Sequence, residues 1–114
     1  MPQHLGELEQ VLLFALVRLG DHAYGASLGR EIEEQTGRSI APGAIYTAMD
    51  RLETRGFVRS RLGESTPARG GRRKKLYRLE PAGARALAES YARVQRMAEG
   101  ALRQLADLTG SGPR

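Results

Sequence analysis

Apolar positions in residues 5–19 repeat with the spacing of one helix face. The repeating residues are separated by steps of three or four, and they are Leu5, Leu8, Leu12, Leu16 and Leu19. Val11, Leu13, Phe14 and Val17 occupy the other side, so this helix is apolar all round and should be buried all round. In so small a domain, we expect one side to contact the core and the other side a second subunit. A central helix that is covered by its own chain fits the pattern equally well.

Two shorter amphipathic helices are predicted next, over residues 24–36 and 42–55. Their expected inward residues are Tyr24, Leu28 and Ile32 in the first helix and Ile45, Met49 and Leu52 in the second. Gly37 is suited to end the first helix, and Pro42 is suited to begin the second. Because only a tight turn separates them, the pair has the outline of a helix-turn-helix.

A β-hairpin and a long final helix complete the predicted fold. FVRSRLGE (57–64) and KLYRLE (75–80) alternate in part and are rich in residues that favour strands. Pro67, Gly70 and Gly71 lie between them and suit a hairpin tip. A helix that opens at Pro81 and runs to about residue 108 would be ~42 Å long at ~1.5 Å per residue.

This final helix carries an apolar seam. Its residues follow alternating steps of four and three, the rhythm of a coiled coil, and they are Leu87, Tyr91, Val94, Ala98, Ala101, Leu105 and Leu108. The helix is too long to pack along so small a domain without projecting. We therefore expect the seam from Leu87 to Leu105, together with Leu12 and Phe14 of the first helix, to form a dimer interface. The alternative is one apolar stripe that folds onto its own domain.

The predicted fold class is mainly α with a small β-hairpin, as a winged helix-turn-helix followed by a long C-terminal dimerisation helix. Residues 1–80 would form the winged domain and residues 81–109 the dimerisation helix. Residues 110–114 are expected to be a disordered tail.

The net charge of +5 is concentrated in one stretch of the chain. Residues 57–80 contain eight cations and two acids, whereas the remaining residues contain 10 cations and 11 acids. Such a concentration is typical of a surface that binds a polyanion. The cations that the predicted hairpin tip would present to DNA phosphates or to a minor groove are Arg69, Arg72, Arg73 and Lys74.

Several classes of site are not indicated by the sequence. There is no Cys, and His4 and His22 have no acidic cluster at ligand spacing. Neither a nucleophile elbow nor a phosphate-cradling loop is found. We therefore expect no cofactor, no metal and no enzymatic activity. The longest apolar run, Val11 to Val17, is too short to span a bilayer and no secretion signal is seen, so we expect a cytoplasmic protein without a membrane partner.

Three longer motifs occur in a characteristic order. They are LEQVLLFALVRLGDHAYG (8–25), IAPGAIYTAMDRLETRGFV (40–58) and RGGRRKKLYRLEPAGARAL (69–87). Together they resemble the PadR family of bacterial transcriptional regulators, in its short form with one C-terminal helix. The resemblance implies a dimer that binds an operator, usually represses transcription and often releases DNA when a small molecule binds. Ala41 departs from the Ser or Thr that is usual before the proline, and the absence of Trp excludes the drug-stacking pair of some multidrug-sensing relatives.

In such a protein, the N-terminal half of the third helix should enter the major groove. The residues expected to contact DNA there are Ser39, Pro42, Gly43, Tyr46, Thr47 and Arg51. Tyr46 would either donate to a phosphate or pack between helices. Arg51 is the one residue of this set with a strong capacity for direct base readout. We therefore expect little base specificity from this helix, so that DNA shape should contribute to recognition. A dimer would place two half-sites about 34–36 Å apart on a pseudo-palindromic operator in double-stranded DNA.

Two other functions fit the same features. One is a winged-helix interaction module that senses no ligand and recruits another protein with its long arm. The other is an architectural protein that binds RNA or DNA without sequence preference. A small hydrophobic effector would bind in a cleft between the first helix and the arm, lined by Leu12, Phe14, Val94 and Met97, unless that cleft is closed core.

Overall fold

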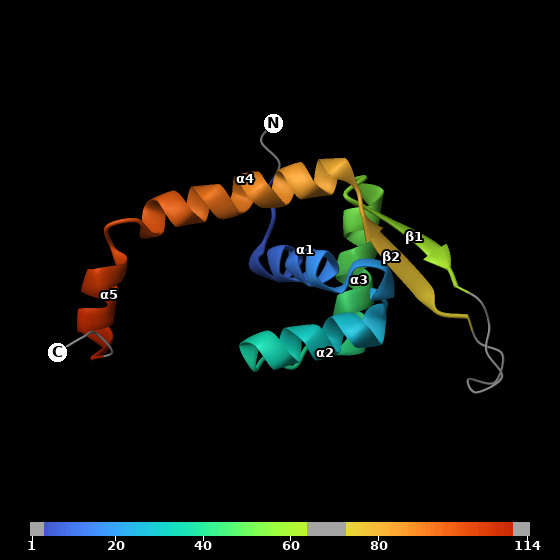
Figure 1. Ribbon diagram of the computed structural model, residues 1–114, viewed down its shortest axis with the longest axis horizontal. Coiled ribbons are helices and arrows are strands. Elements are labelled where there is room, and N and C mark those ends of the chain that lie inside the picture. Colours follow the sequence, from blue (N-terminus) through green and yellow to red (C-terminus); the bar gives the residue numbers. More distant parts are fainter. Residues whose placement is uncertain (1–3, 64–72, 111–114) are drawn as a thin grey trace.

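The computed structural model describes residues 4–63 and 73–110 of the chain. In order, its elements are α1 (Glu7–Leu19), a short turn of 3-10 helix η1 (Gly20–His22), α2 (Gly25–Thr36), α3 (Pro42–Thr54), β1 (Val58–Leu62), β2 (Lys75–Leu79), α4 (Pro81–Ala98) and α5 (Leu102–Thr109). Figure 1 shows α1 at the centre, with α4 above it, α2 below it and α3 beside the hairpin. The mainly helical architecture with one small antiparallel hairpin confirms the predicted fold class.

Helix α1 forms the centre of the hydrophobic core and is largely covered by its own chain. It contacts α2, α3, α4 and β2, and Leu12 and Leu13 are completely buried. The expectation that Leu12 lies in a dimer interface is therefore wrong, because neighbouring elements of the same chain already enclose it. Phe14 and Val17 remain 40% and 59% exposed, so the free side of α1 is narrower than its apolar pattern suggested.

Helices α2 and α3 form the predicted helix-turn-helix. Gly37 ends α2 with φ 75°, a left-handed conformation that glycine adopts at little steric cost. Pro42 is the first residue of α3, where its missing N–H and fixed φ are well tolerated. Ile45, Met49 and Leu52 are buried in the core, as predicted.

The hairpin is attached to the helix-turn-helix through the backbone. β1 and β2 run antiparallel, with Val58 opposite Leu79. Tyr24, just before α2, forms an isolated β-bridge with Leu76 of β2. Tyr24 is consequently the extended N-cap of α2 (φ −135°, ψ 171°), and its prediction as the first inward helical residue is wrong.

The predicted single helix over residues 81–109 is also wrong. α4 ends at Ala98 and α5 begins at Leu102, with Gly100 between them at φ 79°. Glycine is a poor helix former and accepts this left-handed conformation readily, so it ends the helix. The apolar seam predicted one continuous helix because Gly100 lies outside the seam positions.

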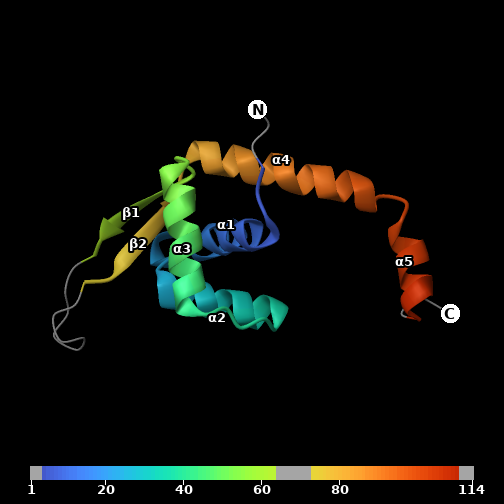
Figure 2. The same ribbon diagram turned by 180° about the vertical axis from the view of Figure 1, so that it is seen from behind.

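The two C-terminal helices differ in how far they are covered. The first half of α4 packs on α1, and Leu87 is only 5% exposed within its own core, which overturns its assignment to a dimer seam. The rest of α4 projects from the body. α5 buries no side chain within the described part of the chain, and Figure 2 shows it standing apart from α2. Gly110 ends α5, and residues 111–114 of the expected tail lie outside the described residues.

Gly83 lets the start of α4 lie directly against the segment that leads into β1. A Cβ atom built at Gly83 would collide with the carbonyl oxygen of Phe57 and would lie 2.9 Å from Cδ1 of Leu79. That oxygen is held in place, because it accepts the backbone N–H of Glu80 at 2.9 Å. The packing of α4 against this segment therefore requires a glycine at position 83.

We expect Gly83→Ala to lower the free energy of unfolding by about 1–3 kcal/mol, measured by urea denaturation, although Ala favours helix. Gly43→Ala in α3 is the matched control, because its Cβ would meet no atom of the described residues within 4 Å. The control should be neutral or stabilising. Equal stability of the two variants would contradict the close contact at Gly83.

Candidate nucleic-acid interface

The N-terminal half of α3 and the turn before it present a polar, exposed surface. All six residues predicted to contact DNA in this region are exposed, namely Ser39, Pro42, Gly43, Tyr46, Thr47 and Arg51. Gly43, Thr47 and Arg51 recur every four residues and so share one side of the helix. Because the opposite side is buried in the core, this surface is held in a fixed position relative to the rest of the domain.

Tyr46 takes the packing role that its sequence position allowed, and it also stays partly exposed to solvent. Its side chain is 45% exposed, and its hydroxyl end packs against the first turn of α2. A Cβ atom built at Gly25 would lie 2.5 Å from the Tyr46 hydroxyl oxygen, so the ring requires the glycine there. The contact fixes the ring between the two helices while much of it still faces solvent.

The cations in and beside the predicted wing differ in their surroundings. Arg69 and Arg72 lie outside the described residues, and Arg73 is exposed. Lys74 is half-buried, with its Nζ 4.0 Å from the centre of the Tyr24 ring. The Nζ of Lys75 lies 3.7 Å from a carboxylate oxygen of Asp50 in α3, so this lysine already has an acidic partner in the same domain.

Glu53 attaches the C-terminal part of α3 to β1. Its carboxylate accepts the backbone N–H of Ser60 at 2.8 Å, and the Ser60 hydroxyl lies 2.8 and 3.0 Å from its two oxygens. These bonds, the backbone bond first, lower the pKa of Glu53. The Asp50–Lys75 pair adds a link from the same helix to β2. The hairpin is therefore fixed relative to the exposed face of α3.

A cluster around Tyr24 could not be anticipated from the sequence. Arg30 donates from Nη2 to the Tyr24 hydroxyl at 3.0 Å, and the Lys74 ammonium lies over the ring. The hydrogen bond from Arg30 is the main cause that lowers the pKa of Tyr24, and Lys74 contributes next. Lys74 is 50 residues away in the sequence, so no local pattern could have placed it beside Tyr24.

Three arginines gather on the outer face of the hairpin. Arg59 and Arg78 are paired across the strands, and both approach Glu80, at 3.2 and 3.8 Å. With Arg61 they line a shallow hollow of about 300 Å³. The Arg59 and Arg78 side chains are largely exposed, so their ion pairs with Glu80 are screened by solvent and contribute little to stability.

The expected effector cleft is divided in the structure. Leu12 does not line it, because this residue is fully buried. Val94 and Met97 border a hollow of about 310 Å³ beside Leu5. Phe14 instead borders a separate, smaller hollow of about 170 Å³ between α1 and α2.

Metal-binding clusters and membrane-spanning helices are not found in the described residues. Across residues 4–63 and 73–110, no group of three His, Cys, Asp or Glu side chains is placed to hold a metal ion. None of the helices in those two ranges combines the length and the apolar character needed to cross a membrane.

Replacing Ser60 with Ala would remove one donor to Glu53 and keep the backbone N–H. Because the folded-state pKa of Glu53 is lowered, its carboxylate stabilises the fold above the unfolded-state pKa, and this contribution is lost as the pH falls through the folded-state pKa. We expect Ser60→Ala to raise the pKa of Glu53 in an NMR titration and to cost about 1 kcal/mol at neutral pH. The cost should shrink in acid. Ser39→Ala is the control, and an unchanged Glu53 pKa in Ser60→Ala would contradict the role of the hydroxyl.

The chain was compared with known protein families and solved structures. Residues 13–89 match the transcriptional regulator PadR-like family. A transcriptional regulator from Clostridium thermocellum is similar in structure, with 26% identity and a TM-score of 0.69 over 81% of this chain and 86% of that chain. A PadR family regulator from Eggerthella lenta DSM 2243 has 27% identity and a TM-score of 0.67 over 87% and 86%.

The fold is also shared with a protein that was solved on DNA. Bacillus subtilis PadR in complex with operator DNA has 22% identity and a TM-score of 0.60, over 73% of this chain and 47% of that chain. No match was found among curated proteins. Since the family match spans well over half of the sequence, the chain belongs to the PadR-like family of transcriptional regulators.

Proposed function

We propose that this protein is a homodimer that binds a pseudo-palindromic operator in double-stranded DNA and represses transcription from it. The observation that carries the proposal is the exposed polar face of α3, which is backed by a buried apolar face and adjoins the basic hairpin. Family membership supports a role in transcription, and the operator complex of B. subtilis PadR supports DNA as the ligand of this fold.

The chemistry of α3 suits entry into a major groove. Gly43 has no side chain and no described neighbour at its Cβ position, so a DNA backbone could approach closely. Thr47 and Arg51 follow one and two turns later on the same side. An arginine can bond both N7 and O6 of guanine, whereas Thr contributes a methyl group that suits thymine. Arg51 would therefore supply most of the direct base recognition.

Arg51 and Arg73 should affect DNA binding in different ways. We expect Arg51→Ala to weaken operator binding by about 1–3 kcal/mol and to affect random duplexes much less. Arg73→Gln should weaken both ligands alike and reduce the salt dependence of log K by about 0.9 for each phosphate that is no longer neutralised. Fluorescence anisotropy on both duplexes at several salt concentrations measures these effects. Arg103→Gln in α5 is the control for the removal of one charge.

Footprinting on duplexes selected from a random pool tests the function itself. A protected palindrome with half-sites one helical turn apart would support the regulator. Uniform protection would instead indicate an architectural protein, and no protection at any salt concentration would indicate a protein-interaction module. Equal weakening of specific and random binding in Arg51→Ala would contradict base recognition by α3.

The proposed dimer rests on apolar side chains left uncovered by the single chain. These exposed residues lie on α1, α4 and α5, and they are Phe14, Val17, Tyr91, Val94, Met97, Leu102, Leu105 and Leu108. Phe14 and Tyr91 meet edge to face with ring centres 5.5 Å apart, which joins the α1 part of the surface to the α4 part. Large apolar side chains that stay exposed on several helices are typical of a protein interface. A helix of eight residues such as α5 is also too short to be stable without packing.

We expect Val94→Glu to give monomers with much weaker operator affinity, because it would place a charge within the proposed interface. Arg96→Gln is the matched control, since it changes the charge by the same amount on the opposite side of α4. Light scattering across a concentration series measures the mass. A Val94→Glu protein that remains dimeric would reject this surface as the interface.

The small hydrophobic effector stays a prediction. The hollow beside Val94 and Met97 adjoins the proposed dimer surface, so a second subunit would help to close it. A ligand bound there would contact α4 and could alter the spacing of the two DNA-binding surfaces.

A further inference from the structure

Two cations from distant parts of the chain converge on the side chain of Tyr24. Arg30 of α2 donates to its hydroxyl oxygen at 3.0 Å, and the Arg30 guanidinium carbon is 5.9 Å from the ring centre. Lys74, one residue before β2, places its Nζ 4.0 Å from the same ring centre. The ring is thus shared by a helix and by the base of the wing.

The positive charge of this cluster is not neutralised within the described part of the chain. The ion pairs found there use other cations, and no carboxylate oxygen of a described residue lies within 4.0 Å of Arg30 or Lys74. The Tyr24 hydroxyl accepts from Arg30, and its own hydrogen has no acceptor among the described residues. Two cations and one free O–H donor suit an anion with several acceptor oxygens.

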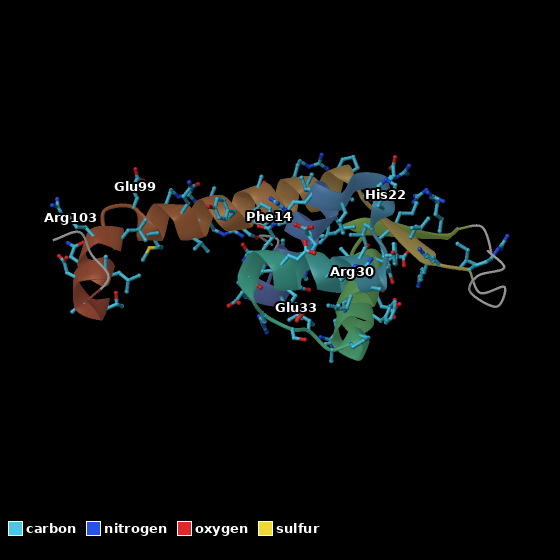
Figure 3. The ribbon with its side chains drawn as sticks, turned by 60° about the horizontal axis from the view of Figure 1, so that its bottom comes forward. Phe14, His22, Arg30, Glu33, Glu99 and Arg103 are labelled. Carbon is cyan, nitrogen blue, oxygen red and sulfur yellow. The ribbon has the colours of Figure 1, made fainter. Side chains whose placement is uncertain are left out.

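The position of the cluster connects the two parts of the proposed DNA surface. On one side, the N–H of Tyr77 donates to the carbonyl of Ala23 at 2.8 Å, which holds Tyr24 beside β2. On the other side, Gly25 is in close contact with the exposed Tyr46 of α3. Figure 3 shows Arg30 on the hairpin side of Glu33 along α2.

We propose that Tyr24, Arg30 and Lys74 together bind one backbone phosphate of the DNA, at the junction of the wing and the helix-turn-helix. This inference rests on the proposed function and adds a contact to it. The Tyr24 hydroxyl donates to one phosphate oxygen, while the Arg30 guanidinium and the Lys74 ammonium neutralise the charge. A phosphate contact carries no base information, so the cluster sets the position and orientation of the protein on the duplex.

The test compares Arg30→Gln, Tyr24→Phe and Arg103→Gln in the full-length protein. Binding to the operator and to a random duplex is followed by anisotropy between about 50 and 200 mM salt. Arg30→Gln should reduce the salt slope by about 0.9 for each protomer, or about 1.8 for the bound dimer, because one phosphate per protomer is no longer neutralised, whereas Arg103→Gln on α5 should not. Tyr24→Phe keeps the ring under Lys74 and removes the hydroxyl, and it should weaken binding to both duplexes about tenfold.

Each outcome separates the contact from a merely structural role. The phosphate contact would be overturned if the salt slope were the same for Arg30→Gln, Arg103→Gln and the unaltered protein. It would also be overturned if Tyr24→Phe bound both duplexes with unchanged affinity. In either case the proposed function would stand as long as the unaltered protein binds the operator. Failure of the unaltered protein to bind any duplex would overturn both. Thermal melting of the variants provides the folding control, and Tyr24→Phe, which retains the aromatic packing, keeps the test valid if Arg30→Gln is destabilised.

Discussion

Burial of α1 is the constraint on which the other elements depend. Leu12 and Leu13 are completely enclosed, and each such side chain contributes about 1.5–3 kcal/mol when it leaves water. Because α2 and α3 pack against this helix together with α4 and β2, the helix sets the relative placement of the DNA-binding and C-terminal parts. A ligand or subunit that displaced α1 would therefore shift both parts.

Much of the fold could be predicted from the sequence, since its signals are local. The inward residues Ile45, Met49 and Leu52 follow one helix face, and Gly37 and Pro42 mark the turn. Membership in a family of transcriptional regulators confirms that the chain is not an enzyme. The predictions at these positions needed no knowledge of distant contacts.

The wrong predictions arose where distant contacts decide the outcome. Leu12 and Leu87 have the spacing of interface residues, but periodicity does not say which neighbour covers an apolar face. Tyr24 follows the helical spacing, yet pairing with Leu76 draws its backbone into an extended conformation. The exposure of the candidate DNA-contact residues on α3 could be predicted, because it follows from which face of the helix is buried. The cluster around Tyr24 could not, because it depends on tertiary contacts. The basic segment is also less uniform than its composition suggested, since Lys75, Arg59 and Arg78 already have acidic partners.

The joint at Gly100 separates α5, a helix that buries none of its described side chains, from the part of the chain that forms the core. Within the described residues α5 buries no side chain, so substitutions along it leave the core of the domain unaltered. The proposed DNA-reading surface lies on α3 and the hairpin, beyond α1 from this joint. In the proposed dimer, related proteins in one cell could therefore differ at α5 and in the angle of the joint, and so avoid mixed pairs, while they keep the same operator. The break at Gly100 would then let the choice of dimer partner change without a change in DNA recognition.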